Sequence, residues 1–283
     1  MATRKPRIKK PALLSRTRPP AARAKLATLS SKATRNLIRT HHRLLKQRTQ
    51  AQQAGDALLV DKIESQIRQN GGLESYQLAS RLGQSLERGG DSSKVLVDWI
   101  TPHLLHERTR LRVLEVGALS TKNACSMNQY MDVTRIDLSS QEPGILKQDF
   151  MERPLPRGDT DRFHVISLSL VLNFVPDAIG RGEMLKRCSA FLTTSPPSGS
   201  SLPFTGMMFL VLPSACINNS RYLTQDRLND IMNSMGFSLS ESKETSKLTF
   251  QLWKHGQNCK PRQFRKEILN PGKKRNNFAI IVK

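Results

Sequence analysis

The chain has 283 residues, of which 37% are hydrophobic, and its 45 Lys and Arg against 23 Asp and Glu give a net charge of +22. That length suits one substantial domain with extensions. No stretch approaches the ~20 apolar residues of a membrane span, and the basic N-terminus lacks the apolar core of a signal peptide. Cys125, Cys188, Cys216 and Cys259 form no CxxC pair, which argues against a zinc site or a disulfide framework.

The positive charge is concentrated at the two ends of the chain. Residues 1–50 hold 15 Lys and Arg and no acidic residue, and residues 254–283 hold nine basic residues and one acidic residue, Glu267. The middle is left with a net charge of about −1, a pattern typical of a globular body with arms that bind a polyanion. We expect residues 1–30 to form a disordered basic tail. Its run from Arg4 to Lys10 favours a nuclear or nucleolar address that also holds RNA, with a solubilising tail as the alternative.

Residues 31–106 have the composition of a helical N-terminal region. Apolar residues recur at helical spacing through residues 34–68, with a break at Gly55-Asp56, and Gly71-Gly72 ends the second helix. A further helix is predicted over 76–86, and Asp91-Ser92-Ser93 has the chemistry of an N-cap before a helix over 94–105. His103 and His106 lie three residues apart without a thiolate or carboxylate partner nearby, so no metal site is predicted.

Residues 107–283 alternate between short β-rich runs and helical stretches. A helix is expected over 224–235, closed by Gly236, and a Ser/Pro/Gly-rich loop over 193–200. Strands are predicted at 111–116, 132–137, 144–149, 163–169, 207–212, 247–253 and 277–283. The pattern predicts an α/β domain with a mostly parallel seven-stranded sheet and helices on both faces.

Ligands of such sheets bind beyond the carboxyl ends of the strands, and several predicted strands end in suitable residues. Gly117 follows the first strand, where it lets backbone approach a ligand, and Glu115 could pair with a ligand ammonium group. Asp137 ends the next strand, twenty residues after Gly117, at the spacing of a carboxylate that binds ribose hydroxyls. Asp149-Phe150 offers a carboxylate and a ring for an adenine. Each feature alone also fits a tight turn or a helix cap, but their succession favours a nucleoside cofactor.

The loop after the fourth strand faces the same crevice. Ser169 begins it as a candidate cofactor contact, and Asn173 and Phe174 could bond and stack a base, although a turn residue and a core residue explain them equally well. A dinucleotide fingerprint requires three glycines, whereas only Gly117 is present, which favours S-adenosylmethionine. The sequence lacks the Asn/Asp-Pro-Pro-aromatic loop of many adenine-N6 methyltransferases. If the methylated base is an adenine, a ring nitrogen is therefore favoured over the N6 amino group as the methyl acceptor.

A family resemblance covers roughly residues 70–283. The segments that carry it are 76–85, Arg88 to Ser93, Leu114 to Leu119, 171–177, Phe264-Arg265-Lys266 and 276–282. These segments resemble the fungal 25S rRNA adenine-N1 methyltransferase family (base methyltransferase 2), within the class I methyltransferases and their Rossmann-like fold. The resemblance implies S-adenosylmethionine as cofactor, with binding positions at Gly117 and Asp137. It also implies methylation of N1 of an adenosine in large-subunit rRNA during ribosome biogenesis.

The resemblance and the charge together predict the partners. Large-subunit rRNA or a pre-ribosome is the expected partner, with the nucleus and nucleolus as compartment and a monomer as oligomeric state. The residues expected to position RNA lie in the basic C-terminal stretch: Lys254, Lys260, Arg262, Arg265 and Lys266. Because a metazoan branch of the family senses the methyl donor, a sensor or a ribosome-assembly factor without catalysis is the alternative. A small-molecule methyltransferase would leave the net charge of +22 without a purpose.

Overall fold

The computed structural model describes residues 30–83, 90–104, 110–140, 142–197, 200, 204–256 and 259–283. The predicted tail up to residue 29 lies outside these ranges, as does His106. Within the described residues, no helix combines the length and the apolar character needed to cross a membrane. The same ranges contain no group of three or more His, Cys, Asp or Glu side chains arranged to hold a metal ion.

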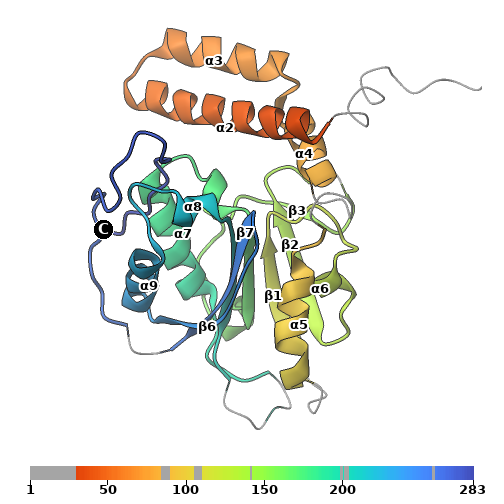
Figure 1. Ribbon diagram of the computed structural model, residues 1–283. Helices are drawn as coiled ribbons and strands as arrows, with labels where there is room; N and C mark the ends of the chain where they lie inside the picture. Colours follow the sequence, from red (N-terminus) through yellow and green to blue (C-terminus); the bar gives the residue numbers. More distant parts are fainter. Residues whose placement is uncertain are drawn as a thin grey trace, which may run out of the picture.

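The described chain begins with the helices α2 (Ser31–Gln53), α3 (Ala57–Gln69) and α4 (Gly72–Gly83). The predicted break between the first two is confirmed, because Gly55 adopts a φ of +72° and the Asp56 side chain caps α3 by accepting from Leu59 N at 3.0 Å. Leu44, Ala51 and Ile63 form a small core between α2 and α3. The helical pair lies across the top of the sheet (Figure 1).

Seven strands of the described chain form one sheet in the order β3-β2-β1-β4-β5-β7-β6. Five are parallel neighbours, and β7 runs antiparallel to both β5 and β6. The strands are β1 (Leu111–Val116), β2 (Met131–Asp137), β3 (Leu146–Lys147), β4 (Val165–Ser169), β5 (Met207–Pro213), β6 (Phe237–Glu244) and β7 (Leu248–His255). The prediction of a mostly parallel, class I methyltransferase-like sheet is confirmed.

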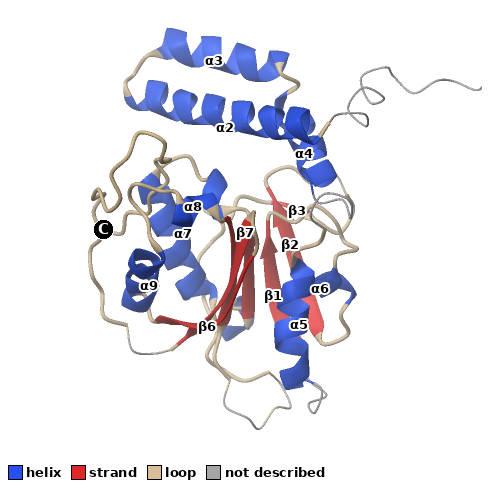
Figure 2. Cartoon of the chain, in the orientation of Figure 1, coloured by secondary structure: helices blue, strands red, loops and turns tan. Residues whose placement is uncertain are grey.

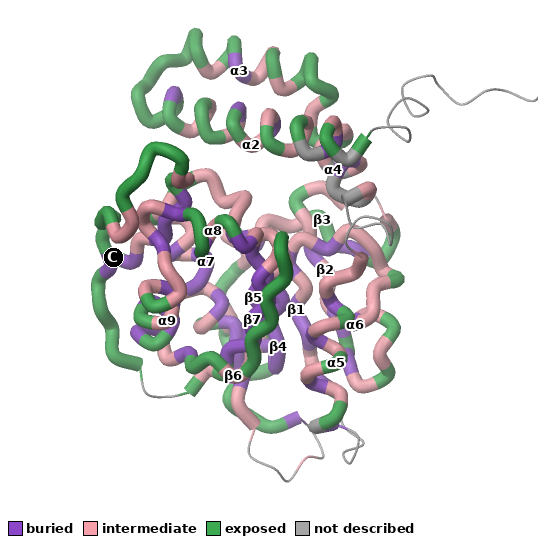
Figure 3. The backbone as a smooth tube through the Cα atoms, in the orientation of Figure 1, coloured by how far each residue is buried: buried purple, intermediate pink, exposed green. Residues whose placement is uncertain are grey.

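Helices cover both faces of this sheet (Figure 2). On one face, α5 (Ser93–Leu104) and α6 (Ala124–Met127) pack on a core that includes Leu96, Val113 and Phe209. The other face carries α7 (Ala178–Phe191), α8 (Ala215–Asn218) and α9 (Gln225–Ser234) over a larger core. Two short 3-10 turns, η1 (Asp159–Asp161) and η2 (Leu172–Phe174), flank β4. The central strands β4 and β5 are buried on both sides, which explains the continuous apolar sequence of β5 (Figure 3).

The prediction of a final strand over residues 277–283 was wrong. That segment makes isolated bridges, such as Phe264 with Val282, and packs against α7, where Ile281 N donates to Ala178 O at 2.9 Å. Its apolar residues are buried by helices rather than paired within the sheet. The seventh strand is β6, an edge strand that the sequence analysis missed. Lys254 to Lys266 therefore begin at the end of β7 and do not lie between two strands.

His164 is a buried histidine whose neutral form the fold requires. It is 3% exposed, and its Nδ1 accepts a hydrogen bond from Arg112 N at 2.8 Å. Burial, assisted by the Arg112 charge, lowers the pKa of His164 from 6.5 to about 4. A lowered pKa means that the stabilisation is complete above pH 6.5 and is lost as the pH falls towards 4.

We expect the free energy of unfolding to fall by about 3 kcal/mol between pH 7 and 4 on account of His164, since one pKa unit corresponds to about 1.4 kcal/mol. A His164→Asn variant keeps an acceptor for Arg112 N and does not titrate, so this part of the pH dependence should vanish. Urea unfolding at a series of pH values measures it. An unchanged pH profile in the variant would contradict the assignment.

Candidate active site

Gly117 turns the chain sharply at the carboxyl end of β1. Its φ is +76°, and Gly117 N and Ala118 N both donate to Ile136 O, at 2.9 and 3.1 Å. A Cβ at this position would lie 2.6 Å from Val171 Cγ2, in the loop after β4. Only glycine therefore fits without strain at this φ and without displacing the Val171 side chain, and bare backbone is presented at the edge where ligands of such sheets bind.

Asp137 ends β2, the strand beside β1. Its Oδ1 accepts from Ser139 N at 2.9 Å, and its carbonyl accepts from Gln148 N at 2.8 Å. The next residue, Leu138, is a large apolar side chain that is 59% exposed. The structure therefore places a carboxylate and an exposed apolar side chain together at the carboxyl edge, one strand away from Gly117. The apolar partner was not recognised in the sequence.

Glu115 is held by protein groups on the face covered by α5 and α6. Asn123 Nδ2 donates to its Oε1 at 2.6 Å, and Cys125 Sγ lies 3.8 Å from its Oε2. Burial raises the pKa of the Glu115 carboxyl above its ordinary value, with the Asn123 hydrogen bond opposing that shift. These contacts join the end of β1 to the segment that follows Gly117.

Asp149 and Phe150 lie beyond β3 and differ in their surroundings. Asp149 Oδ1 accepts from Met151 N at 2.7 Å and is partly exposed. The Phe150 ring is 2% exposed and packs at 5.4 Å from Phe191 and 5.7 Å from the Arg187 guanidinium. The ring that was expected to meet an adenine is therefore part of the core in this structure, whereas the Asp149 carboxylate stands at the surface.

The loop after β4 is strained at its first turn. Ser169 ends the strand, and the next residue, Leu170, has a φ of +58°. Within the described chain, every other residue with a positive φ is a glycine. Leu170 N donates to Val211 O at 3.0 Å, which fixes this costly conformation. Non-glycine residues in this region cluster at functional sites, because surrounding structure must compensate for the strain. Leu170 and Val171 lead from the carboxyl end of β4 into η2.

The start of α5 reaches the same edge, which the sequence analysis did not foresee. Ser92 Oγ and Ser169 Oγ share a hydrogen bond of 2.6 Å. Asp91 accepts from Ser93 Oγ at 2.7 Å through Oδ1 and from Ala124 N at 2.5 Å through Oδ2. The segment predicted as an N-cap therefore also ties together β4, the loop after β1 and α5. Only the Asp-Ser-Ser motif hinted at this, through its part in the family resemblance.

Asn173 and Phe174, the expected base pocket, belong to η2. Asn173 Oδ1 is buried and has no hydrogen-bond partner among the described residues. The Phe174 ring stacks on His42 of α2, with centroids 4.1 Å apart. The 3-10 turn thus presents a flat ring and an unsatisfied acceptor side by side. The part played by α2 was not predicted, since residues 42 and 174 are far apart in the sequence.

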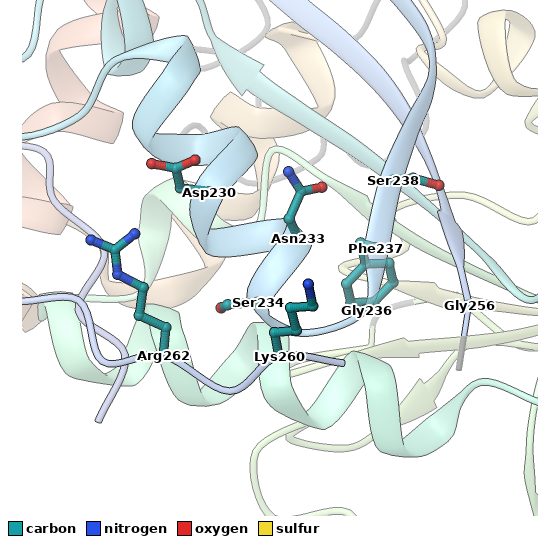
Figure 4. A pocket seen from close by; sticks show the side chains of 9 residues that line it. All are labelled: Asp230, Asn233, Ser234, Gly236, Phe237, Ser238, Gly256, Lys260 and Arg262. Atoms are coloured by element: carbon teal, nitrogen blue, oxygen red, sulfur yellow. The ribbon is translucent and has the colours of Figure 1, made fainter. Parts of the chain in front are cut away.

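The basic residues expected to position RNA are exposed but spread out. Lys254 pairs with Met207 at the start of β5, so it lies at the amino edge of the parallel strands, opposite Gly117. Lys260 and Arg262 line a cavity of about 580 Å³ at the same edge, together with Asp230 of α9 (Figure 4). Lys266 Nζ lies 4.4 Å from the Tyr222 ring, on the flank of the molecule nearer the carboxyl edge.

Solved structures with a similar sheet include methyltransferases, at low similarity. One is an S-adenosylmethionine-dependent methyltransferase from Clostridium acetobutylicum, with a TM-score of 0.45, 13% identity, and 64% of this chain and 99% of that one covered. Another is the N-methyltransferase NodS from Bradyrhizobium japonicum in complex with S-adenosyl-L-homocysteine, with a TM-score of 0.41, 9% identity, and 61% and 92% covered. The fold assignment rests on the strand order and not on these scores.

Two curated proteins match most of the chain in sequence. The chain is 39% identical over 248 residues to the 25S rRNA (adenine(2142)-N(1))-methyltransferase of Saccharomyces cerevisiae, covering 85% of this chain and 70% of that protein. It is 39% identical over 253 residues to the 25S rRNA adenine-N(1) methyltransferase of Schizosaccharomyces pombe, covering 86% and 89%. The family described as 25S rRNA (adenine(2142)-N(1))-methyltransferase, Bmt2, matches residues 61–280, and the chain belongs to this family.

Proposed function

We propose that this protein is an S-adenosylmethionine-dependent methyltransferase that modifies N1 of an adenine in large-subunit rRNA. The observation that carries the proposal is the family match over residues 61–280, which contains every residue described above at the carboxyl edge except His42 of α2. The bare backbone at Gly117, one strand from the Asp137 carboxylate, supports it independently.

The residues at the carboxyl edge fit a nucleoside cofactor. Gly117 leaves room that a side chain would fill, and Asp137 offers a carboxylate to ribose hydroxyls. Leu138, being 59% exposed, offers an apolar surface to the adenine in place of Phe150, and Asp149 offers an acceptor for its amino group. Ser169, bonded to Ser92, borders the same edge. Bound there, S-adenosylmethionine would supply an activated methyl group.

Methylation of adenine N1 requires few catalytic groups from the protein. N1 carries an in-plane lone pair and no proton at neutral pH, so the chain needs no general base. Its residues must orient the base and exclude water, and orientation alone can account for several orders of magnitude in rate. N1 lies on the pairing edge of adenine, so the target base must be unpaired or flipped out. The Phe174 ring and Asn173 Oδ1 are suited to receive such a base.

Asn173 can also select adenine over guanine. The exocyclic amino group of adenine is a donor adjacent to N1, whereas guanine carries a carbonyl oxygen there. Asn173 Oδ1 is a buried acceptor without a partner among the described residues, and a donor from the substrate would satisfy it. We assign Asn173 to the base edge and Phe174 to the base face.

The positive charge supports the proposals on RNA binding and location. Lys254, Lys260, Arg262, Arg265 and Lys266 are exposed and offer contacts to phosphates away from the site. Pre-ribosomal large-subunit rRNA is the proposed substrate, the nucleus with its nucleolus the proposed compartment, and a monomer the proposed state. The helical region over residues 31–106 is proposed as a unit that accompanies the catalytic domain over 107–283.

The deciding experiment supplies isotopically labelled S-adenosylmethionine and undermethylated large-subunit rRNA to the wild-type protein and to Gly117→Arg. Digestion to nucleosides and mass spectrometry should find label in 1-methyladenosine for the wild type and none for the variant. Label in another nucleoside would refute N1 as the acceptor. Folded protein that binds the cofactor but transfers no label would instead point to a sensor or an assembly factor.

An Asn173→Ala variant is expected to lower kcat/KM about 10- to 100-fold, since a lost hydrogen bond that leaves a buried partner unsatisfied costs about 1–3 kcal/mol. The same RNA with purine riboside in place of the target adenosine lacks the amino group. The lower nucleophilicity of N1 in purine riboside slows both proteins equally, so the wild type, which also loses the hydrogen bond, should lose about 10- to 100-fold more than Asn173→Ala. Additive losses would place Asn173 elsewhere than at the amino group.

A further inference from the structure

Rings from three separate elements gather over the loop that follows β4. His42 of α2 stacks on Phe174 of η2, with centroids 4.1 Å apart and planes 11° from parallel. Tyr76 of α4 meets both rings edge-on, with centroids 5.0 Å from His42 and 5.9 Å from Phe174. His41 stacks on Tyr76 at 4.8 Å and not on Phe174. The imidazole of His42 therefore covers the ring assigned to the base face, and α2 lies across that edge of the sheet (Figure 1).

This stack leaves polar groups unsatisfied. Both ring nitrogens of His42 and Oδ1 of Asn173 are buried without a hydrogen-bond partner among the described residues. Such groups are rare in folded proteins, because burial removes the hydrogen bonds they make with water. Burial, and then the nearby His41, lowers the pKa of His42 from 6.5 to about 4, so its ring is uncharged at neutral pH.

An uncharged, flat nitrogen heterocycle on Phe174 has the character of an unpaired purine. Adenine offers the same stacking face over a larger area, and its amino group can also donate to Asn173. His42 stacks on Phe174 but leaves Asn173 Oδ1 unsatisfied. Exchange of the imidazole for an adenine would keep the stack and satisfy the buried acceptor, and it would return the His42 nitrogens to water.

The helix that carries His42 also presents a surface for RNA. Helix α2 contains no acidic residue, and among its described side chains the exposed basic ones are Lys32, Arg39, Arg43 and Lys46. Their spacing of seven, four and three residues places them on one face of the helix. His42 lies one helical turn before Lys46, at i and i+4, so it borders this basic face. RNA phosphates bound along the face would lie next to the ring that occupies Phe174.

We propose that His42 occupies the place of the target adenine in the free protein, and that RNA bound along the basic face of α2 exchanges a flipped adenine for the His42 ring on Phe174. The inference rests on the proposed function and adds a substrate-side role for α2. No covalent step is involved. His42 is thus a positioning residue that the substrate displaces, and α2 shifts relative to η2 when the base enters.

Kinetics of His42 variants provide the first test. His42→Ala removes the competitor and should lower KM for undermethylated large-subunit rRNA about two- to tenfold, the range that corresponds to a stacked aromatic pair, with kcat unchanged. His42→Phe strengthens the stack and should raise KM by a similar factor. His41→Ala is the matched control on the same helix, since His41 stacks on Tyr76, and it should not lower KM. A KM for folded His42→Ala that is unchanged or raised would overturn the proposal.

A measurement on the wild-type protein avoids any dependence on variant folding or on catalysis. An NMR titration should give His42 a pKa of about 4 in the free protein, rising towards 6.5 when a saturating single-stranded oligoadenylate is bound. An abasic strand of the same length should leave the pKa at about 4. If oligoadenylate leaves it there too, the exchange does not occur. Failure of methyl transfer in the labelling experiment would refute the proposed function without affecting this readout.

Discussion

A Gly117→Ala variant is expected to fold and to lose about 100-fold in methyl transfer. Alanine is strained at the φ of +76° that this position adopts, and its Cβ would press on Val171 Cγ2 from 2.6 Å. Because Val171 adjoins η2, relief of this overlap turns the Val171 side chain out of its packed position or moves the backbone after β1 or the loop that carries Asn173. A displacement of about 1 Å at a site that acts by alignment costs about 100-fold in rate.

Gly55→Ala is the matched control for this experiment. Gly55 has nearly the same φ, +72°, but its Cβ would meet no atom within 4 Å, and it lies in the turn between α2 and α3. Gly55→Ala should therefore lower stability by about 1 kcal/mol and leave turnover intact. Adding Val171→Ala to Gly117→Ala should restore part of the activity, because the overlapping methyl group is removed. Without any recovery, the contact with Val171 would not be the cause.

Gly182→Ala is expected to produce the largest loss of stability among the single changes considered. In an exposed helix interior this substitution would stabilise by about 1 kcal/mol. At Gly182 in α7 the new Cβ would overlap the carbonyl oxygen of Ile281 and lie 2.9 Å from its carbonyl carbon. The segment over residues 277–283 would have to lift from α7, which would expose part of Phe278, Ile280 and Val282.

We expect Gly182→Ala to destabilise the protein by about 2 kcal/mol, the usual scale of overpacking, and to lower the Tm by roughly 4–8 °C. Differential scanning calorimetry measures the change. Gly158→Ala serves as the control, because the nearest atom to its Cβ would be Thr160 Oγ1 at 4.0 Å. A Tm for Gly182→Ala at or above that of the wild type would show that residues 277–283 do not pack on α7 as described.

The strands that could be predicted from the sequence are those whose environment leaves a local signature. β1, β4 and β5 lie between two helical layers, so most of their residues are apolar, and in β5 the apolar run is unbroken. The strand β6 has one buried residue, Phe237, followed by the largely exposed Ser-Leu-Ser-Glu-Ser-Lys-Glu. Such a sequence does not alternate clearly, and its strand conformation depends on pairing with β7. No local pattern identifies it.

The C-terminal segment illustrates the opposite error. Asn277–Lys283 contains Phe278, Ala279, Ile280, Ile281 and Val282, a composition typical of a buried strand. Burial is confirmed for most of these residues, but they are covered by α7 and α9 instead of neighbouring strands. Apolar β-branched residues predict that a segment is buried. Whether its backbone also pairs with the sheet depends on which strand occupies the edge of the sheet. Because β5 and β6 already pair with the two sides of β7, the C-terminal segment cannot pair with β7.

The residues of the candidate site differ in the same way: some have a local sequence signature and others depend on tertiary packing. Gly117 and Asp137 could be placed from the sequence, because Gly117 follows β1 directly and Asp137 is the last residue of β2. The position of each strand in the sheet therefore fixes the position of the residue. The contacts of Ser92 with Ser169 and of His42 with Phe174 join residues more than 70 positions apart, and only the packing of helices on the sheet brings them together. Phe150 was misjudged for a related reason, since the sequence cannot say to which side of the chain a ring turns.

The two outer strands of the sheet have a consequence for handling the protein at high concentration. β3 is only two residues long, and β6 is lined with serines and charged side chains and contains a register shift between Leu239 and Glu241. Short, charged and irregular borders give an incoming strand little backbone to pair with. The sheet therefore resists growing by strand addition from another copy, and aggregation through cross-chain β-structure is disfavoured.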